Sequence, residues 1–299
     1  MAVRGFMQVA IHLGVHCTDE DRLLKTLLQN KGALAKLGIS VPGPGRYRKS
    51  VTREAQRLRG FPTDHDSRDL LVDSIVDDDS ASRMILTFEN FLCDPARVFE
   101  NGLLYDQSGS RPKNLQNLFL DLPVEFFISI RNPATFVPAI FHHKDQMISD
   151  FKAFLDGVDL EDIRWSDVIA AIKENCPDCP ITVWCNEDTP LIWPEIVHQV
   201  TGCPKMDELL GGNNVLASIM KNEGLDRMQT YLESHPPRNE GQRRRIILAF
   251  LDKYAIADAV EEELDVPGWS DELVKVLTQN YEADLEEISQ MQGVNLISP

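Results

Sequence analysis

The stretch from Gln8 to Leu37 constrains the fold most, because it has the pattern of a buried strand, a tight loop and an amphipathic helix in direct succession. Residues 8–14 are mostly apolar, as in a short strand buried within a sheet. From Asp21 to Leu37 leucines recur at helical spacing, and Gly38 follows as a C-cap. Unpaired amides at the start of such a helix normally bind an anion. The pattern therefore predicts an α/β unit of the kind that binds phosphate.

The loop of this unit carries three consecutive acidic residues, Asp19, Glu20 and Asp21, where a phosphate would bind. A phosphate within ~4 Å of each carboxylate would be repelled by roughly 4 kcal/mol per pair at an effective dielectric near 20. Carboxylates at a helix start also cap free amides, each contributing about 0.3–1 kcal/mol. We therefore expect the triplet to replace a phosphate, with Thr18 and Asp21 resembling a capping box. The alternatives are an unusual ligand, such as a cation, or a metal site built from His16, Cys17, Asp19 and Asp21.

Strand and helix patterns alternate along the first two thirds of the chain. The predicted strands cover Val9–Leu13, Met84–Thr87, Phe126–Ile130 and Ile181–Trp184. After Gly211-Gly212 the pattern is helical throughout. This alternation predicts an α/β fold, with a parallel sheet of about four or five strands and helices on both faces. We expect residues 1–210 to form this core, and residues 211–299 to form a helical C-terminal extension packed on it.

The composition indicates an ordinary globular protein of 299 residues, 43% hydrophobic and 26% charged. No segment predicts a membrane span, and the N-terminus lacks the pattern of a signal peptide. The six cysteines are too sparse for a disulfide scaffold, and Cys176-Pro-Asp-Cys179 is interpreted as a structural turn between a helix and a strand. We therefore expect a cytoplasmic protein.

The charge is strongly negative but unevenly distributed. A net charge of −17 argues against nucleic acid and anionic membranes as partners, leaving a small molecule or a protein. Residues 1–60 nevertheless carry 11 Lys and Arg against 4 Asp and Glu. The basic excess lies between Arg46 and Arg59. This cluster could receive an anionic acceptor, but we expect it to dock against the acidic remainder or to form a solvated helix face.

The segment His12–Leu24 resembles the start of bacterial sulfotransferase-family proteins, which typically read His-hydrophobic-Gly-x-His-Lys-Thr-Gly-Thr-Thr-x-Leu. Gly38-Ile-Ser-Val-Pro42 is similar to the Gly-Ile-x-x-Pro that follows the first helix in that family. The resemblance implies a P-loop-like fold in which the Lys and Gly-Thr-Thr cradle the 5′-phosphosulfate of the donor, 3′-phosphoadenosine-5′-phosphosulfate (PAPS). Here Thr18 is kept, the Lys position is Cys17, and Gly-Thr-Thr is replaced by Asp19–Asp21.

Glu89 follows the second predicted strand, where the resemblance implies a residue that deprotonates the acceptor hydroxyl. It is therefore the candidate general base. Its alternative role is a carboxylate hydrogen-bonded to loop amides. After the fourth predicted strand, Glu187 and Asp188 look like the family's structural acidic element and are expected to cap the helix that begins at Thr189-Pro190.

Arg131-Asn-Pro follows the third predicted strand and resembles the start of the family's 3′-phosphate signature. The resemblance makes Arg131 a candidate for catalysis and phosphate binding, with Asn132 and Thr18 as further candidate cofactor-binding residues. The second Arg of the signature is replaced by Phe136, and its Ser by Ala139. Alternatively, Arg131 pairs with Asp19 or Asp21.

Two hypotheses follow from these scattered motifs, which cover roughly residues 8–200. Loss of the Lys, the Gly-Thr-Thr and the Ser in one cofactor site favours a pseudo-enzyme, which keeps the fold, lacks a cofactor and has a binding or interaction role. The alternative is an active sulfotransferase that transfers a sulfuryl group from PAPS to a hydroxyl or amine through an atypical donor site. Fold similarity by itself does not decide between them.

Overall fold

A parallel sheet lies at the centre of the molecule. The computed structural model describes residues 7–203, 209–260 and 264–299. These residues form a six-stranded sheet with the order β2-β3-β1-β6-β7-β8, in which every neighbouring pair is parallel. The four central strands are β1 (Gln8–His12), β3 (Arg83–Thr87), β6 (Val124–Ile130) and β7 (Ile181–Cys185). The predicted fold class and these four strands are confirmed.

The sheet has two strands more than those four, one at each edge. They are β2 (Ile39–Ser40) and β8 (Val294–Ile297). Two- and four-residue strands are too short to produce a recognisable hydrophobic pattern, so sequence periodicity does not detect them.

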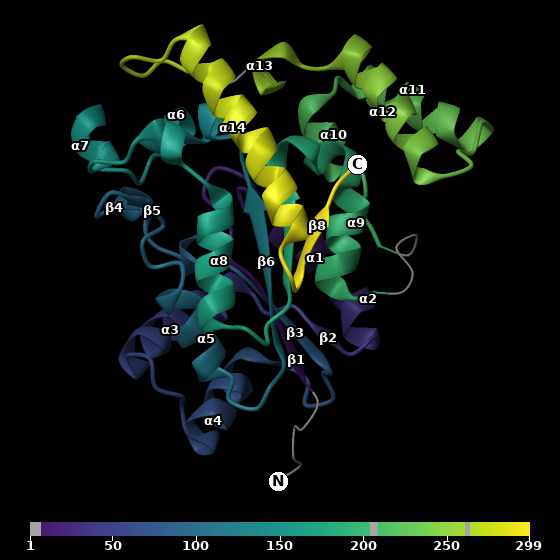
Figure 1. Ribbon diagram of the computed structural model, residues 1–299. Helices are drawn as coiled ribbons and strands as arrows, with labels where there is room; N and C mark the ends of the chain where they lie inside the picture. The colour runs from purple at the N-terminus through teal and green to yellow at the C-terminus, as the bar shows by residue number, and fades with distance from the viewer. Residues whose placement is uncertain (1–6, 204–208, 261–263) are drawn as a thin grey trace.

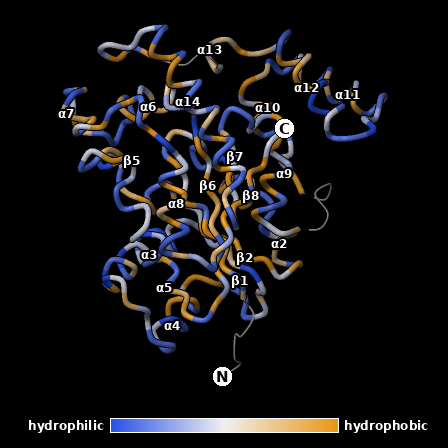
Figure 2. The backbone as a smooth tube through the Cα atoms, in the orientation of Figure 1, coloured by the Kyte–Doolittle hydropathy of each residue, from blue (hydrophilic) through white to orange (hydrophobic). Residues whose placement is uncertain are grey.

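Helices cover both faces of the sheet, as Figure 1 shows. One face is covered by α3 (Pro44–Leu58), α4 (His65–Ile75), α5 (Ser110–Leu118), α6 (Pro133–Phe141), α8 (Trp165–Asn175) and α14 (Asp271–Gln290). The other face is covered by α1 (Arg22–Gln29), α2 (Lys31–Lys36), α9 (Thr189–Thr201) and α10 (Asn214–Ile219). Apolar residues concentrate along the strands between these layers (Figure 2).

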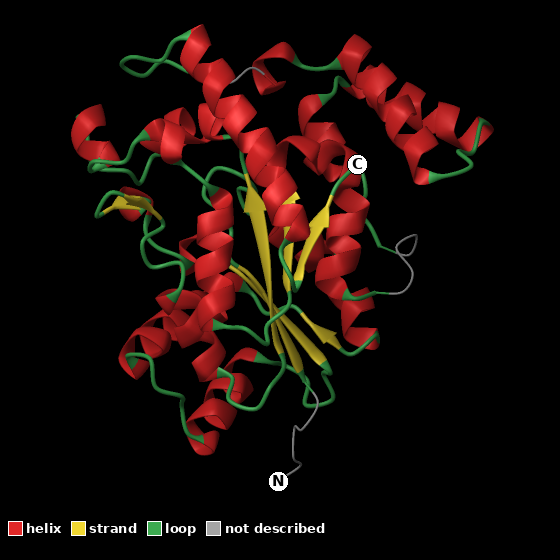
Figure 3. Cartoon of the chain, in the orientation of Figure 1, coloured by secondary structure: helices red, strands yellow, loops and turns green. Residues whose placement is uncertain are grey.

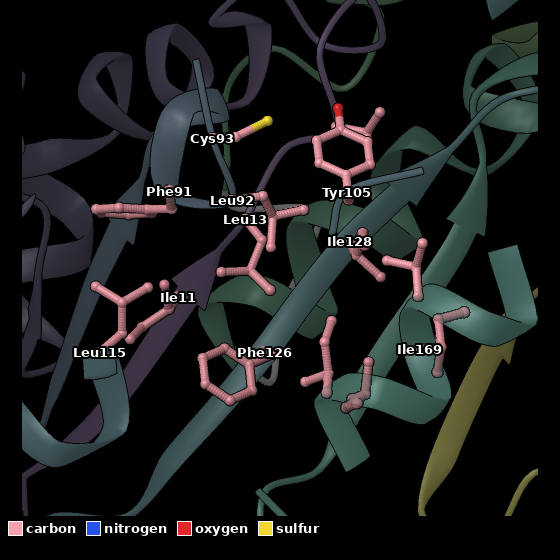
Figure 4. Close-up of a cluster of buried hydrophobic side chains, with 14 of the residues drawn as sticks. Ile11, Leu13, Phe91, Leu92, Cys93, Tyr105, Leu115, Phe126, Ile128 and Ile169 are labelled. Carbon is pink, nitrogen blue, oxygen red and sulfur yellow. The ribbon is translucent and has the colours of Figure 1, made fainter. Parts of the chain in front are cut away.

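The larger core lies on the first face. Figure 4 shows Ile11 and Phe126, from adjacent strands, in one buried cluster with Ile169 of α8. All three side chains are fully buried, and burial of a side chain of this size contributes about 1.5–3 kcal/mol. Because alternate residues of a strand face opposite sides, Ala10 and Phe127 enter the second core, beneath α1 and α9.

The helix predicted over Asp21–Leu37 is two helices, α1 and α2, that meet at Asn30. The Asn30 amide donates to the carbonyl oxygens of Thr26 and Leu210, both at 2.8 Å, and its Oδ1 accepts from the Leu210 backbone at 2.7 Å. A side chain that hydrogen-bonds nearby backbone groups competes with helical bonding. The contact with Leu210, 180 residues away, could not be anticipated from local periodicity. Gly38 ends α2 with φ +75°, as predicted.

The C-terminal third of the chain contains a strand as well as helices. Beyond α10 the chain forms α11 (Asn222–Ser234), α12 (Glu240–Tyr254), α13 (Ala257–Val260) and α14, followed by strand β8. The prediction of a wholly helical C-terminal third is therefore wrong for β8, which pairs with β7. Helices α10, α11 and α12 share a small core of Leu216, Met220, Met228 and Ile247.

Short elements occupy the connections, and Figure 3 shows one small pair of strands outside the central sheet. They are the antiparallel pair β4 (Phe99–Glu100) and β5 (Leu103–Leu104), α7 (Phe151–Leu155), and 3₁₀ turns at Glu89–Phe91, Pro95–Arg97, Leu160–Asp162 and Asn186–Asp188. Cys176 and Cys179 form the predicted turn between α8 and β7, with a 3.1 Å backbone bond. No helix in the described ranges has the length and apolar character required to span a bilayer.

Candidate functional site

The carboxyl ends of β1 and β6 lie side by side, and the chain leaves them toward opposite faces of the sheet. After β1 the chain enters α1 on one face, and after β6 it enters α6 on the other. In open α/β sheets ligands bind outside the strand ends at such a switch point. The loop of residues 13–21 lies there and remains tied to β6, because Ser129 N donates to Gly14 O at 2.8 Å. This loop and the neighbouring strand ends form the candidate site.

The backbone of the loop is constrained. Gly14, Cys17, Glu20 and Asp21 have φ values of +95°, +58°, +49° and +63°. For residues other than glycine such left-handed conformations cost of order 1–3 kcal/mol and are frequent at functional sites. At Gly14 an added Cβ would lie 2.8 Å from the Cα of Glu89, so the position has no room for a side chain. The loop thus packs directly against the end of β3.

Asp19 supplies the internal carboxylate that the sequence predicted. Its Oδ1 accepts from Leu23 N at 2.9 Å, and its carbonyl oxygen accepts from Arg22 N at 2.9 Å. The predicted capping of the first helix is therefore confirmed for this residue. Burial raises the pKa of Asp19 to about 7, and the negative charges of Asp21 and Glu89 act in the same direction, whereas the Leu23 amide opposes them.

The same capping prediction is wrong for Asp21 and Glu20. Asp21 occupies the N-cap position of α1, but its side chain makes no capping hydrogen bond. A capping residue requires an extended backbone, whereas both residues have left-handed φ values. The Glu20 side chain is exposed, 3.7 Å from Arg22. Thr18 does not form a capping box either, because its hydroxyl donates back to Val15 O at 2.7 Å and closes the loop.

Arg48 is the partner of Asp21, and sequence reasoning did not identify this pair. Its Nη1 donates to Asp21 Oδ2 at 3.2 Å, its Nη2 binds the second carboxylate oxygen, and its Nε donates to Thr87 O at 3.2 Å. Hydrogen bonding to Asp21 raises the pKa of Arg48, against the lowering effect of burial. The rest of the basic cluster behaves as expected, since Arg46 pairs with Asp77 and Arg57 with Glu54.

Arg131 and Asn132 lie at the end of β6, but they point to different parts of the structure. The buried Arg131 donates through Nη1 to Cys17 O at 2.6 Å and through Nε to Thr135 Oγ1 at 3.0 Å. Of the two carboxylates given as alternative partners for Arg131, Asp21 is bound by Arg48 and Asp19 accepts from Leu23 N. Asn132 accepts from Ala134 N at 3.0 Å as the cap of α6 and donates to Thr278 of α14. Ala139 lies farther along α6 and is half-buried.

Glu89 lies directly after β3, beside the loop. Its half-buried carboxylate makes no hydrogen bond or ion pair within the described residues, so the alternative role, bonding to loop amides, is not found. Burial raises the pKa of Glu89, the charge of Asp21 raises it further, and His143 and Arg48 oppose this. Catalytic acids and bases are often half-buried carboxyl groups with a raised pKa.

Two buried histidines, His12 at the end of β1 and His16 within the loop, make contacts that the sequence did not predict. His12 hydrogen-bonds Thr87 Oγ1 through Nδ1 at 2.9 Å and stacks on Trp184, with ring centroids 5.4 Å apart. His16 contacts the Tyr105 hydroxyl through Nδ1 at 2.8 Å and Asn90 Oδ1 through Nε2 at 3.1 Å. Burial lowers the pKa of His12 to about 3 and that of His16 to about 4. Both rings are therefore neutral at physiological pH and join neighbouring strand ends.

At the end of β7, Glu187 connects β6 to α14. Its Oε1 accepts from Asn132 N at 2.8 Å, and its Oε2 accepts from the Tyr281 hydroxyl at 3.3 Å. The prediction that Glu187 and Asp188 cap α9 is wrong, since the N-cap Asp188 makes no capping bond. The reason is local, because both residues belong to a 3₁₀ turn that runs directly into the helix.

No protein-family model matches this chain, and no curated protein matches it. Within the ranges that the structure describes, no group of three or more His, Cys, Asp or Glu side chains is arranged to hold a metal ion. What the site can do is therefore judged from its own residues. It combines a loop filled by Asp19, two arginines in contact with loop atoms, and Glu89.

Proposed function

We propose that this chain is a divergent sulfotransferase-fold protein that has lost PAPS binding and acts as a binding or interaction protein. The observation that carries the proposal is the bond from Leu23 N to Asp19 Oδ1. A phosphate at a helix start is normally held by such amides. An incoming phosphate would have to displace Asp19 and would also approach the carboxylates of Asp21 and Glu89.

The engagement of the nearby arginines supports the same proposal. Arg48 forms a two-pronged contact with Asp21, and Arg131 donates to the carbonyl oxygen of Cys17. A phosphate would compete with these partners for both guanidinium groups. Paired guanidinium and carboxylate groups make strong, directional hydrogen bonds, so that competition is costly.

The second candidate is an active sulfotransferase with an atypical donor site. Glu89 favours it, because this half-buried carboxylate beside the loop has a raised pKa and no hydrogen-bond partner among the described residues. In this case Glu89 would remove a proton from the acceptor, and Arg131 would bind the donor.

Calorimetric titration with the desulfonated product, 3′-phosphoadenosine-5′-phosphate (PAP), separates the two. We expect the parent protein to bind PAP more weakly than about 1 mM, equivalent to less than ~4 kcal/mol. The variant Cys17→Lys/Asp19→Gly/Glu20→Thr/Asp21→Thr should gain measurable affinity for PAP or sulfate. The matched control Asp64→Ala removes an exposed cap on α4, far along the chain, and should leave PAP binding unchanged.

Micromolar binding of PAP by the parent protein would reverse the proposal. The enzyme hypothesis would then be tested by sulfuryl transfer from PAPS to hydroxyl and amine acceptors. Glu89→Gln should abolish that transfer while leaving PAP binding intact.

A further inference from the structure

A cavity of about 280 Å³ lies between α3 and α5, away from the residues of the loop. Its apolar lining comes from Ala55, Phe91 and Leu115, all buried. Figure 4 shows Phe91 and Leu115 close together at the same side of the core cluster. The remaining lining residues are polar or basic, and they include Arg97 and Arg111. The lining therefore combines three apolar residues with two arginines and several neutral polar side chains.

The charge of the cavity is opposite to that of the protein. Two arginines line it, and the described lining contains no Asp or Glu, although the chain as a whole carries a net charge of −17. Arg97 is already paired with Glu100, through Nη2 at 2.7 Å. Arg111 is not paired with a carboxylate: its Nε donates to Gln107 Oε1 at 2.8 Å, and its Nη atoms have no hydrogen-bond partner among the described residues. A positioned guanidinium fork thus remains available.

Asn114 adds a neutral donor on the same wall. Gly60 N donates to its Oδ1 at 2.9 Å, which orients the amide and leaves Nδ2 without a partner in the described chain. A guanidinium fork beside an oriented amide is suited to the two oxygens of a carboxylate or phosphate group. Ligand pockets generally combine an apolar lining with a few such polar groups, and typical volumes begin at about 300 Å³.

We propose that this cavity binds a small organic anion. Its carboxylate or phosphate group contacts the Nη atoms of Arg111 and the Asn114 amide, and its apolar body packs on Phe91 and Leu115. The inference goes beyond the proposed function, because none of these residues belongs to the loop. If the cavity binds no anion, the expected result of the PAP titration does not change.

The test is calorimetric titration of the full chain with phenyl phosphate and with benzoate, which distinguish the two anionic groups. Inorganic phosphate reports the head group alone, and benzyl alcohol reports the apolar body alone. We expect at least one aromatic anion to bind with a Kd below roughly 10 mM, and benzyl alcohol to bind at least about tenfold more weakly. Arg111→Met should raise the Kd for that anion by about tenfold or more.

The matched control is Arg53→Met, which removes an exposed arginine from α3 that does not line the cavity. It should leave binding unchanged. If Arg111→Met does not fold, Arg111→Lys keeps the charge, loses the planar fork and should still weaken binding. The proposal is overturned if neither anion binds below roughly 10 mM, if the Arg111 variants bind as the parent does, or if Arg53→Met loses as much affinity.

Discussion

Asp19 combines two effects that act in opposite directions on stability. Its carboxyl oxygen caps α1 through Leu23 N, which stabilises the fold. Its burial raises the pKa from 3.8 to about 7, so that ionisation is unfavourable in the folded protein. The folded state consequently holds a proton that the unfolded state releases between these two values. The stabilisation that this group contributes is fully present below pH 4 and is lost as the pH rises through 7.

Two substitutions at Asp19 separate these effects. Asp19→Asn keeps the acceptor and cannot ionise, so it should be more stable than the parent at pH 8 by about 1–2 kcal/mol and equal to it at pH 4. This gain in stability is smaller than the full pKa shift implies, because the Asp19 side chain is partly exposed and water screens its charge. Asp19→Ala should lose about 1 kcal/mol at pH 4 because the cap is removed, and this loss should be offset at pH 8 because Ala, like Asn, cannot ionise. Urea unfolding at the two pH values measures this, and an Asn variant with no advantage at pH 8 would contradict it.

His12 shows the reverse pH dependence. Its pKa falls from 6.5 to about 3 on folding, because the buried ring cannot accommodate a charge. Stability from this group is complete above pH 6.5 and decreases as the pH falls toward 3. His12→Phe keeps an aromatic ring against Trp184. Between pH 6 and 4.5, the free energy of unfolding should fall less steeply in this variant than in the parent, by up to about 1.4 kcal/mol per pH unit. Equal slopes in the parent and the variant would disprove the assignment.

Sequence reasoning at the residue scale succeeded where the interaction is local. The cap from Asp19 to Leu23 spans four residues, and helix-start chemistry is sufficient to predict it. The pair between Arg48 and Asp21 spans 27 residues, and the same region offers several other arginines. Choosing the correct partner requires knowing that the start of α3 lies against the end of β3, which depends on the folded topology.

At the scale of elements, the connection from β1 to α1 depends on close backbone approach at Gly14. Gly14→Ala should destabilise the protein by more than about 2 kcal/mol, because φ is +95° and the added Cβ would lie 2.8 Å from Glu89 Cα. Gly45→Ala is the control: it has open space in α3 and should be neutral or stabilising by up to about 1 kcal/mol. Thermal and urea unfolding compare them, and equal stabilities would show that the loop can move away from β3.

The prediction of elements from sequence depended on length and burial. The central strands have five to seven residues and are almost entirely buried, so each forms a recognisable apolar run. The edge strand β8 is partly exposed and has four residues, and the break at Asn30 depends on contact with Leu210. Local sequence contains too little information about such long-range contacts to predict either feature.

For the whole molecule, the dominant electrostatic effect is self-repulsion from the net charge of −17. We expect the melting temperature at pH 7.5 to rise by several degrees when NaCl increases from roughly 10 mM to 150 mM, because the Debye length shortens to about 8 Å. The increase should shrink near pH 5, where carboxylates begin to take up protons. A melting temperature that falls with salt would instead mean that ion pairs such as Arg48–Asp21 outweigh the repulsion.

The central position of β1 has a consequence for the order of events during synthesis. β1 is made before both of its neighbours in the sheet, which are residues 83–87 and 124–130. At typical elongation rates its second edge stays unpaired for on the order of ten seconds after it leaves the ribosome. Until residues 83–87 are made, the apolar side chains of Val9, Ile11 and Leu13 have no sheet to enter, and until residues 124–130 are made β1 has only one neighbouring strand. We therefore expect this segment to be exposed to aggregation while the chain is being made.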